Sequence, residues 1–166
     1  MSTDAIVLLK QDHKQIRALF TRFERAGAGA RVERGRLVKQ VLELLTVHTY
    51  IENECMYPRV RALLPDLEAD VLESYEEHHV ADVLCTELSL MKPTDERFDA
   101  KATVLIESVR HHMEEEERDW FPKVRSALGR KQLQELGAEM IELKRTAPRS
   151  PAQPSAIKKA IDAVVS

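Results

Sequence analysis

The chain has 166 residues, with 25 Lys and Arg against 28 Asp and Glu, and a formal net charge of −3. This balance argues against a protein that coats nucleic acid, and the length suits one domain with a single core. The longest stretch without Asp, Glu, Lys or Arg is 8 residues, too short for a secretion signal or a membrane span. Two cysteines, Cys55 and Cys85, are too few for a disulfide framework. We therefore expect a cytoplasmic protein that binds neither nucleic acid nor membrane.

The spacing of apolar residues predicts helices along nearly the whole chain and no sheet, so we expect an all-α protein. The first helix begins after Ser2 or Thr3, either of which can act as its N-cap, and ends at the Ala-Gly repeat of residues 26–30. The second helix follows this repeat and contains Pro58, which has no backbone N–H to donate. We therefore expect a kink or a break near Tyr57.

The second half of the chain is predicted to contain two long helices followed by weaker elements. The apolar pattern predicts a third helix over residues 66–91 and a fourth that begins directly after the cap Thr94 and ends around Gly129. A shorter fifth helix is expected over 130–145. Residues 148–154 are rich in proline, which is typical of a linker, and 156–165 form a small amphipathic pattern.

The chain nearly repeats itself at an offset of 64–65 residues. In each copy a single histidine, His13 or His78, lies on the first helix of a predicted helical hairpin. A second histidine, His48 or His112, lies on the second helix and is followed four residues later by a glutamate. We expect the two hairpins to bring these side chains together with approximate two-fold symmetry. The repeated set comprises His13, His48, Glu52, His78, His112 and Glu116.

The spacing within each His-x-x-x-Glu motif has a direct geometric meaning. Residues four apart on an α-helix differ by about 40° in direction and lie about 6 Å apart along the axis, so both side chains can face one point. Two buried glutamates need a compensating positive charge, and no Lys or Arg lies on these helical stripes. Since carboxylates can bridge two ions, four His and two Glu suit a dinuclear centre of iron, manganese or zinc.

These motifs resemble the His, His-x-x-x-Glu, His, His-x-x-x-Glu signature of hemerythrin-like proteins, also called HHE cation-binding domains. An aromatic-proline pair in each copy, at 57–58 and at 121–122, strengthens the resemblance. The resemblance implies an up-down-up-down four-helix bundle over residues 1–128, with 129–166 as a short C-terminal helical extension that includes the proline-rich linker. It also implies two non-heme iron ions, bridged by an oxo or hydroxo group, that react with hydrogen peroxide, dioxygen or nitric oxide.

The chain departs from the oxygen-carrying hemerythrins, in which the resemblance leads us to expect five His and two carboxylate ligands. The third helix of those proteins gives two His spaced by four. Here the residue four after His78 is Asp82, and the residue four before His79 is Tyr75. Tyr57 and Asp82 are the candidates for the changed ligand position. The repeat favours His78 as the ligand, while the neighbouring apolar stripe turns His79 closer to the core.

A changed ligand position favours redox turnover over reversible oxygen carriage. We therefore expect catalase-like decomposition of hydrogen peroxide in oxidative-stress defence, with an oxygen, nitric oxide or iron binding or sensing module as the alternative. Ferritin-like iron storage fits less well, because its Glu-x-x-His motif occurs only at Glu76 and His79. No feature of the sequence indicates a protein partner.

Overall fold

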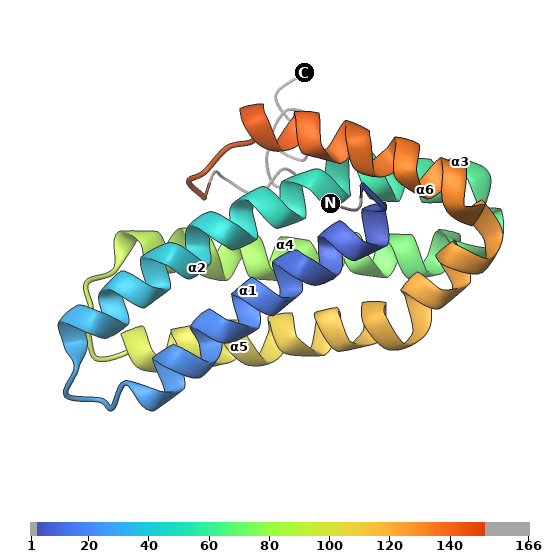
Figure 1. Cartoon of the computed structure of the whole chain (residues 1–166). Helices are drawn as coiled ribbons and strands as arrows, with labels where there is room; N and C mark the ends of the chain where they lie inside the picture. The colour runs from blue at the N-terminus through green and yellow to red at the C-terminus, as the bar shows by residue number, and fades with distance from the viewer. Residues whose placement is uncertain (1–2, 152–166) are drawn as a thin grey trace, which may run out of the picture.

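The structure is a computed structural model that describes residues 3–151, and within these residues it contains helices and no strand. Four long helices, α1, α2, α4 and α5, lie side by side with alternating directions, which confirms the predicted all-α bundle (Figure 1). The elements are α1 (Ala5–Arg25), α2 (Arg31–Ile51), the π-helix η1 (Glu52–Met56), α3 (Tyr57–Leu63), the 3₁₀ helix η2 (Pro65–Leu67), α4 (Glu68–Leu90), α5 (Phe98–Glu115), the π-helix η3 (Glu116–Trp120) and α6 (Phe121–Thr146).

The N-cap of α1 is Asp4 and not Thr3 or Ser2, the latter lying outside the described residues. The Asp4 carboxylate accepts a hydrogen bond from the backbone N–H of Val7 at 3.1 Å, and it also accepts two from the Arg125 guanidinium. A carboxylate at this position satisfies an otherwise unpaired N–H of the first turn. The ion pair with Arg125 explains why Asp4 takes the cap in place of the hydroxyl residues before it.

The kink expected near Tyr57 is a single turn of π-helix, and a matching turn occurs in the second half of the chain. In η1 the backbone N–H of Tyr57 donates to the Glu52 carbonyl five residues earlier, and in η3 that of Phe121 donates to Glu116. Each turn precedes a proline, which cannot donate to the carbonyl four residues before it. The wider turn brings residues five apart closer in direction, and such turns are frequent at functional sites.

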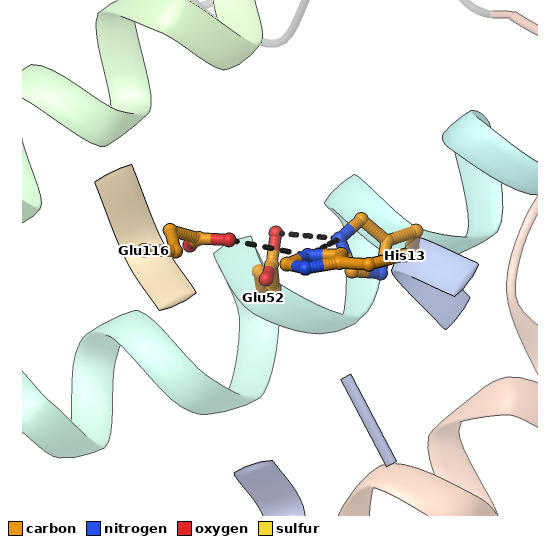
Figure 2. A group of neighbouring side chains, drawn as sticks. His13, Glu52 and Glu116 are labelled. Atoms are coloured by element: carbon orange, nitrogen blue, oxygen red, sulfur yellow. Dashed lines mark hydrogen bonds and ion pairs between the residues drawn. The ribbon is translucent and has the colours of Figure 1, made fainter. Parts of the chain in front are cut away.

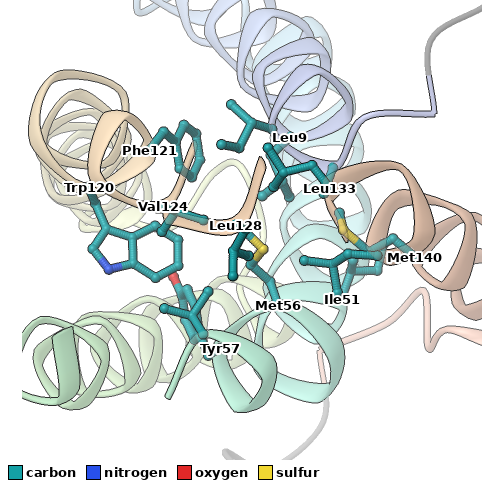
Figure 3. Packing of buried hydrophobic residues seen from close by; sticks show 14 of the residues in the cluster. Leu9, Ile51, Met56, Tyr57, Trp120, Phe121, Val124, Leu128, Leu133 and Met140 are labelled. Carbon is teal, nitrogen blue, oxygen red and sulfur yellow. The ribbon is translucent and has the colours of Figure 1, made fainter. Parts of the chain in front are cut away.

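The last helix, α6, bends at Gly129 and then returns along the bundle. Gly129 has φ 69° and ψ 172°, so the expected helix end at this position is present as a break inside α6. The part after Gly129 packs against α1, α2 and η1 (Figure 1). Its residues Leu133 and Met140 belong to the same apolar cluster as Ile51 (Figure 3). The predicted helix at 156–165 lies outside the described residues, and the division of the chain at residue 128 stays a prediction.

Two apolar clusters fill the bundle and flank a polar layer between them. One cluster lies toward α3 and α6 and includes Leu9, Met56 and Phe121 (Figure 3). The other lies toward the opposite end of the bundle and includes Phe20 and Leu105. The four helices therefore present their few buried polar side chains in a region enclosed by well-packed apolar residues, which positions these groups firmly and keeps bulk water away.

Candidate metal centre

The structure brings together all six side chains of the repeated motif. They form two groups, one of His13, His48, Glu52 and Glu116 and the other of Glu52, His78 and His112. Within each group one potential ligand atom per residue lies within 4.8 Å of the others. Each of the six residues is at most 6% exposed. Charged groups buried to this degree require partners or a metal ion.

The first group is formed by α1, the end of α2 and the starts of η1 and η3. The His13 Nε2 atom lies 3.2 Å from His48 Nε2 and 3.3 Å from Glu116 Oε2. The His48 Nε2 atom lies 3.3 Å from Glu52 Oε2. Figure 2 shows His13, Glu52 and Glu116 pointing toward one another from three separate segments. This set of nitrogen and oxygen atoms suits a first-row divalent metal.

The second group is built on α4, α5 and the start of η1, and it shares Glu52 with the first group. The His78 Nε2 atom lies 3.0 Å from His112 Nε2 and 3.2 Å from Glu52 Oε2. The His112 Nε2 atom lies 3.5 Å from Glu116 Oε1. Both glutamates therefore reach His side chains of both groups, which is the arrangement needed for carboxylates that bridge two ions.

Each of the four histidines directs Nε2 into the site and Nδ1 toward an acceptor outside it. The Nδ1 atoms of His13 and His78 lie 2.7 Å from Glu117 Oε1 and 2.7 Å from Asn53 Oδ1, respectively. The same atoms of His48 and His112 contact Asp12, at 3.3 Å, and Glu77. Such outer acceptors fix the tautomer and ring orientation of metal-ligating histidines.

Sequence reasoning missed these outer acceptors, although the repeat contained the signal. Asp12 and Glu77 each precede a predicted histidine by one residue. Asn53 and Glu117 each follow a predicted glutamate by one residue. Both pairs are related by the same 64–65 offset as the histidines themselves. A search for repeated polar neighbours would have found all four.

The electrostatics of the site indicate that it is built for added positive charge. Burial, together with the nearby Glu116 carboxylate, raises the pKa of Glu52 to about 7. The pKa of Glu116 is lowered despite burial, because His112 and His13 stabilise its ionised form. The Glu52 Oε1 atom is buried and accepts no hydrogen bond. A bound cation would let both carboxylates ionise and would give this oxygen a partner, so the residues fit a metal centre.

The Tyr57 side chain also points into the site, which a straight helix would not allow. Its hydroxyl donates to Glu116 Oε1 at 2.9 Å and lies 3.1 Å from His78 Nε2. Burial raises the pKa of the Tyr57 phenol well above its usual value, so the hydroxyl keeps its proton. At the equivalent position of the other half, Phe121 stacks on the His13 ring with centroids 5.7 Å apart.

The two remaining candidates, His79 and Asp82, lie away from both groups. His78 is buried among the ligand-type side chains, whereas His79 is half-buried and its Nδ1 atom has no hydrogen-bond partner. Burial raises the pKa of the Asp82 carboxyl to about 6. The described part of the chain therefore brings Tyr57, and neither His79 nor Asp82, to the six repeated side chains.

A four-helix bundle with paired His and Glu groups in its interior is typical of helical metal-binding proteins. Comparison with known families makes this specific: the chain belongs to the hemerythrin HHE cation-binding domain family, whose model matches residues 4–124. This finding confirms the resemblance stated from the sequence. None of the helices in residues 3–151 has the length and apolar character needed to cross a membrane.

Two known proteins are similar to this chain over most of its length. The crystal structure of a hemerythrin HHE cation-binding domain-containing protein of Mycobacterium kansasii matches 86% of this chain and 86% of its own with a TM-score of 0.73 at 23% identity, so the two share a fold. A curated protein of Nostoc sp., named a DNA nickase, is 26% identical over 132 residues. That match covers 80% of this chain but only 36% of the nickase, so the chain spans about a third of that relative.

Proposed function

We propose that this protein is a non-heme diiron protein of the cytoplasm that decomposes hydrogen peroxide in defence against oxidative stress. The observation that carries the proposal is the Tyr57 hydroxyl, which lies within hydrogen-bond distance of Glu116 and of His78. The resemblance leads us to expect a further histidine in an oxygen carrier, and a phenol near the metal position suits redox turnover instead.

The six repeated side chains would hold the two ions. His13 and His48 would bind one ion, His78 and His112 would bind the other, and the two glutamates would bridge them. When bound, an iron pair supplies the two-electron chemistry that oxidises one hydrogen peroxide molecule to dioxygen and reduces a second to two water molecules. The two protons released in the first half-reaction equal the two consumed in the second, so no external reductant is required.

The protein's own residues would hold protons and exclude water during this cycle. The raised pKa of Tyr57 keeps a proton on its hydroxyl, beside the Glu116 oxygen that accepts its hydrogen bond. A hydroxyl that keeps its proton in a fixed position would act as a hydrogen-bond donor toward charge that develops on the reacting peroxide. The outer carboxylates of Asp12 and Glu117 orient His48 and His13, and their own contacts with Lys144 and Arg17 hold them in place.

The test measures oxygen evolution after hydrogen peroxide is added to protein of known iron content, with the metal-free protein as the blank. Oxygen release in proportion to iron would support the proposal. A variant with His48→Ala and His112→Ala removes one nitrogen ligand from each group, and we expect it to lose both iron and activity. Equal oxygen evolution from this variant would overturn the proposal.

The same experiment distinguishes peroxide decomposition from the main alternative, a binding or sensing function. Stoichiometric iron without turnover would favour a module that binds or senses oxygen, nitric oxide or iron. Two zinc ions retained from the cell, in place of iron, would keep the metal site and reject the peroxide chemistry, because zinc does not change oxidation state. The small-molecule partners expected under the proposal are hydrogen peroxide and dioxygen.

A further inference from the structure

A groove with a volume of about 240 Å³ leads from the surface to the second group of the candidate metal centre. It lies between α4 on one side and α5, η3 and the start of α6 on the other. His112 and Glu116 line its inner end. Among the described residues that line it, six are carboxylates and Lys123 is the only lysine or arginine. The acidic side chains nearer the surface are Asp70, Glu73, Glu115 and Asp119.

The two-fold repeat supplies an internal comparison, because the bundle has an equivalent position on its opposite side. There the repeat has smaller or apolar residues in place of the four outer carboxylates of the groove. Asp70 corresponds to Ala5, Glu73 to Leu8, Glu115 to Ile51 and Asp119 to Cys55. Ala5 and Ile51 are buried in the apolar cluster.

The helix α6 covers this opposite side and leaves the acidic side open (Figure 1). Its Glu139 accepts two hydrogen bonds from Arg59, at 2.8 and 2.9 Å, and its Lys144 donates to Asp12 at 2.6 Å. Its Leu136 and Met140 are buried against the core. The candidate metal centre is therefore sealed on one side by a packed helix, while the equivalent side retains a polar groove.

A group of ligand-type side chains combines two residues of the groove, Glu77 and Glu115, with the neighbouring His111. Glu77, His111 and Glu115 each offer one atom within 4.8 Å of the others, and His111 Nε2 lies 3.2 Å from Glu115 Oε1. The His111 side chain is 68% exposed. Glu77 also contacts His112 Nδ1, so it belongs both to this outer group and to the surroundings of the buried centre.

The inner end of the groove contains two buried polar side chains. Glu116 is 2% exposed and lines the groove, and its Oε1 and Oε2 atoms lie 3.5 Å from His112 Nε2 and 3.3 Å from His13 Nε2, respectively. The Nε1 atom of Trp120 is buried without a hydrogen-bond partner. Figure 3 shows this nitrogen on the side of the indole ring that faces away from the apolar cluster. A buried carboxylate that contacts histidines of both ligand groups, at the end of an acidic groove, is suited to receive a cation that enters along the groove.

We propose that this groove is the route by which divalent cations reach the buried centre, with Glu77, His111 and Glu115 as a transient binding place on the way. The inference rests on the proposed metal centre and adds the path that fills it. Clefts lined by one sign of charge raise the local concentration of opposite ions and their rates of association. Mixed nitrogen and oxygen ligands at the outer group replace part of the hydration shell before the cation moves inward.

The test follows the loading of Co²⁺ into the metal-free full-length chain by the visible absorption of the bound ion, at low ionic strength. The groove variant carries Glu73→Gln, Glu115→Gln and Asp119→Asn. We expect it to load on the order of 10-fold more slowly than the wild type and to reach the same final cobalt content. Added salt should shrink the difference, because it screens exposed charges.

The control variant carries Glu96→Gln, Glu107→Gln and Glu142→Gln, which change the net charge equally at exposed positions outside the groove. We expect it to load at the wild-type rate. His111→Asn should slow loading without a change in net charge. Equal rates for the groove and control variants would overturn the route, whereas absence of bound cobalt in the wild type would overturn the metal centre itself. Far-UV circular dichroism of each metal-free protein confirms that all are folded to the same extent.

Discussion

The two halves of the bundle place equivalent side chains around one centre but surround them differently. His13, His48 and Glu52 of the first half correspond to His78, His112 and Glu116 of the second. Each half also provides a π-helical turn that begins at its glutamate. The repeated features are those that a metal needs, namely inward nitrogens, shared carboxylates and oriented rings. The features that differ therefore indicate how the two proposed ions would be distinguished and reached.

Three differences between the halves are concrete. A phenol at Tyr57 corresponds to a phenyl ring at Phe121, and the neutral Asn53 corresponds to the charged Glu117. The groove beside α4 and α5 is open and acidic, whereas its counterpart beside α1 and α2 is covered by α6. The first group of ligands is thus enclosed by charged acceptors with cationic partners, and the second group lies next to a hydroxyl and an opening to solvent. We infer that substrate reacts on the side of the second group.

The largest expected effect comes from removing the hydroxyl that distinguishes the second half. Tyr57→Phe should lower peroxide turnover by about 10²-fold or more, because it removes a positioned hydrogen-bond donor, while iron content and thermal stability stay close to those of the wild type. The matched control is Tyr75→Phe, since the Tyr75 hydroxyl donates to the backbone carbonyl of Asn53 outside the site. Oxygen evolution per bound iron measures both. Equal losses in the two variants would reject a specific role for Tyr57.

A smaller effect should follow from making the two outer acceptors alike. Glu117→Gln replaces the charged partner of His13 with an amide like that of Asn53. We expect it to lower the affinity for one of the two ions about 10-fold and to leave the affinity for the other unchanged. Titration of the metal-free protein with Fe²⁺ under anaerobic conditions resolves the two affinities. Glu114→Gln, in the same acidic run but exposed, is the control. Equal weakening of both ions would show that the halves do not act separately.

The repeat explains why so much of the candidate site could be predicted. A duplicated His-x-x-x-Glu in register identified the six inward side chains, because helical periodicity fixes which residues share a face. The position of Tyr57 was harder, since five residues beyond Glu52 a regular helix directs it elsewhere. Only the π turn brings it in, and that turn depends on Pro58 together with the packing of the surrounding helices. Sequence spacing alone contains no record of this change in register.

The position of α6 over one side of the site could not be predicted from the sequence pattern either. Residues 130–145 showed a helical pattern, but the direction of that helix depends on the backbone at Gly129, whose positive φ reverses the chain. Its contacts with Asp12 and Arg59 join residues more than 75 positions apart in the chain. Periodicity reports which face of a helix is buried and not which neighbour buries it. The difference between the sealed and the open side of the site follows from this one bend.

The sealed side can be loosened at Gly137, where α6 meets the start of α1. A Cβ atom added there would overlap the backbone carbonyl of Thr3. The overlapping atoms belong to the backbone, so they cannot move aside as the end of a flexible side chain could. Gly137→Ala should therefore lower the free energy of unfolding by about 2 kcal/mol, despite the better helix propensity of alanine. Urea denaturation measures the change. Gly29→Ala adds a Cβ that meets no other atom and serves as the control. A more stable Gly137→Ala protein would contradict the tight packing of α6.

The smallest effect concerns two ion pairs. In each of them an arginine of one half contacts the start of the first helix of the other half. Arg125 donates to Asp4 at the start of α1, and Arg61 donates to Glu68 at the start of α4. The pKa of Asp4 is lowered although burial opposes this, because the hydrogen bonds from Arg125 and Val7 favour the carboxylate. The unfolded chain therefore binds the proton more tightly, and the stability contributed by Asp4 is present above its unfolded pKa of about 4 and declines as the pH falls below it.

Asp4→Asn keeps a capping side chain and removes the charge, so we expect a loss of about 1 kcal/mol at pH 7 that shrinks as the pH falls from 4 toward 2. Glu68→Gln should change stability by about 0.5 kcal/mol or less, because its pair with Arg61 is half exposed to solvent. Urea titrations of both variants at pH 7, 4 and 3 compare the two pairs directly. A loss for Asp4→Asn that does not vary with pH would mean that the carboxylate charge contributes nothing at this helix start.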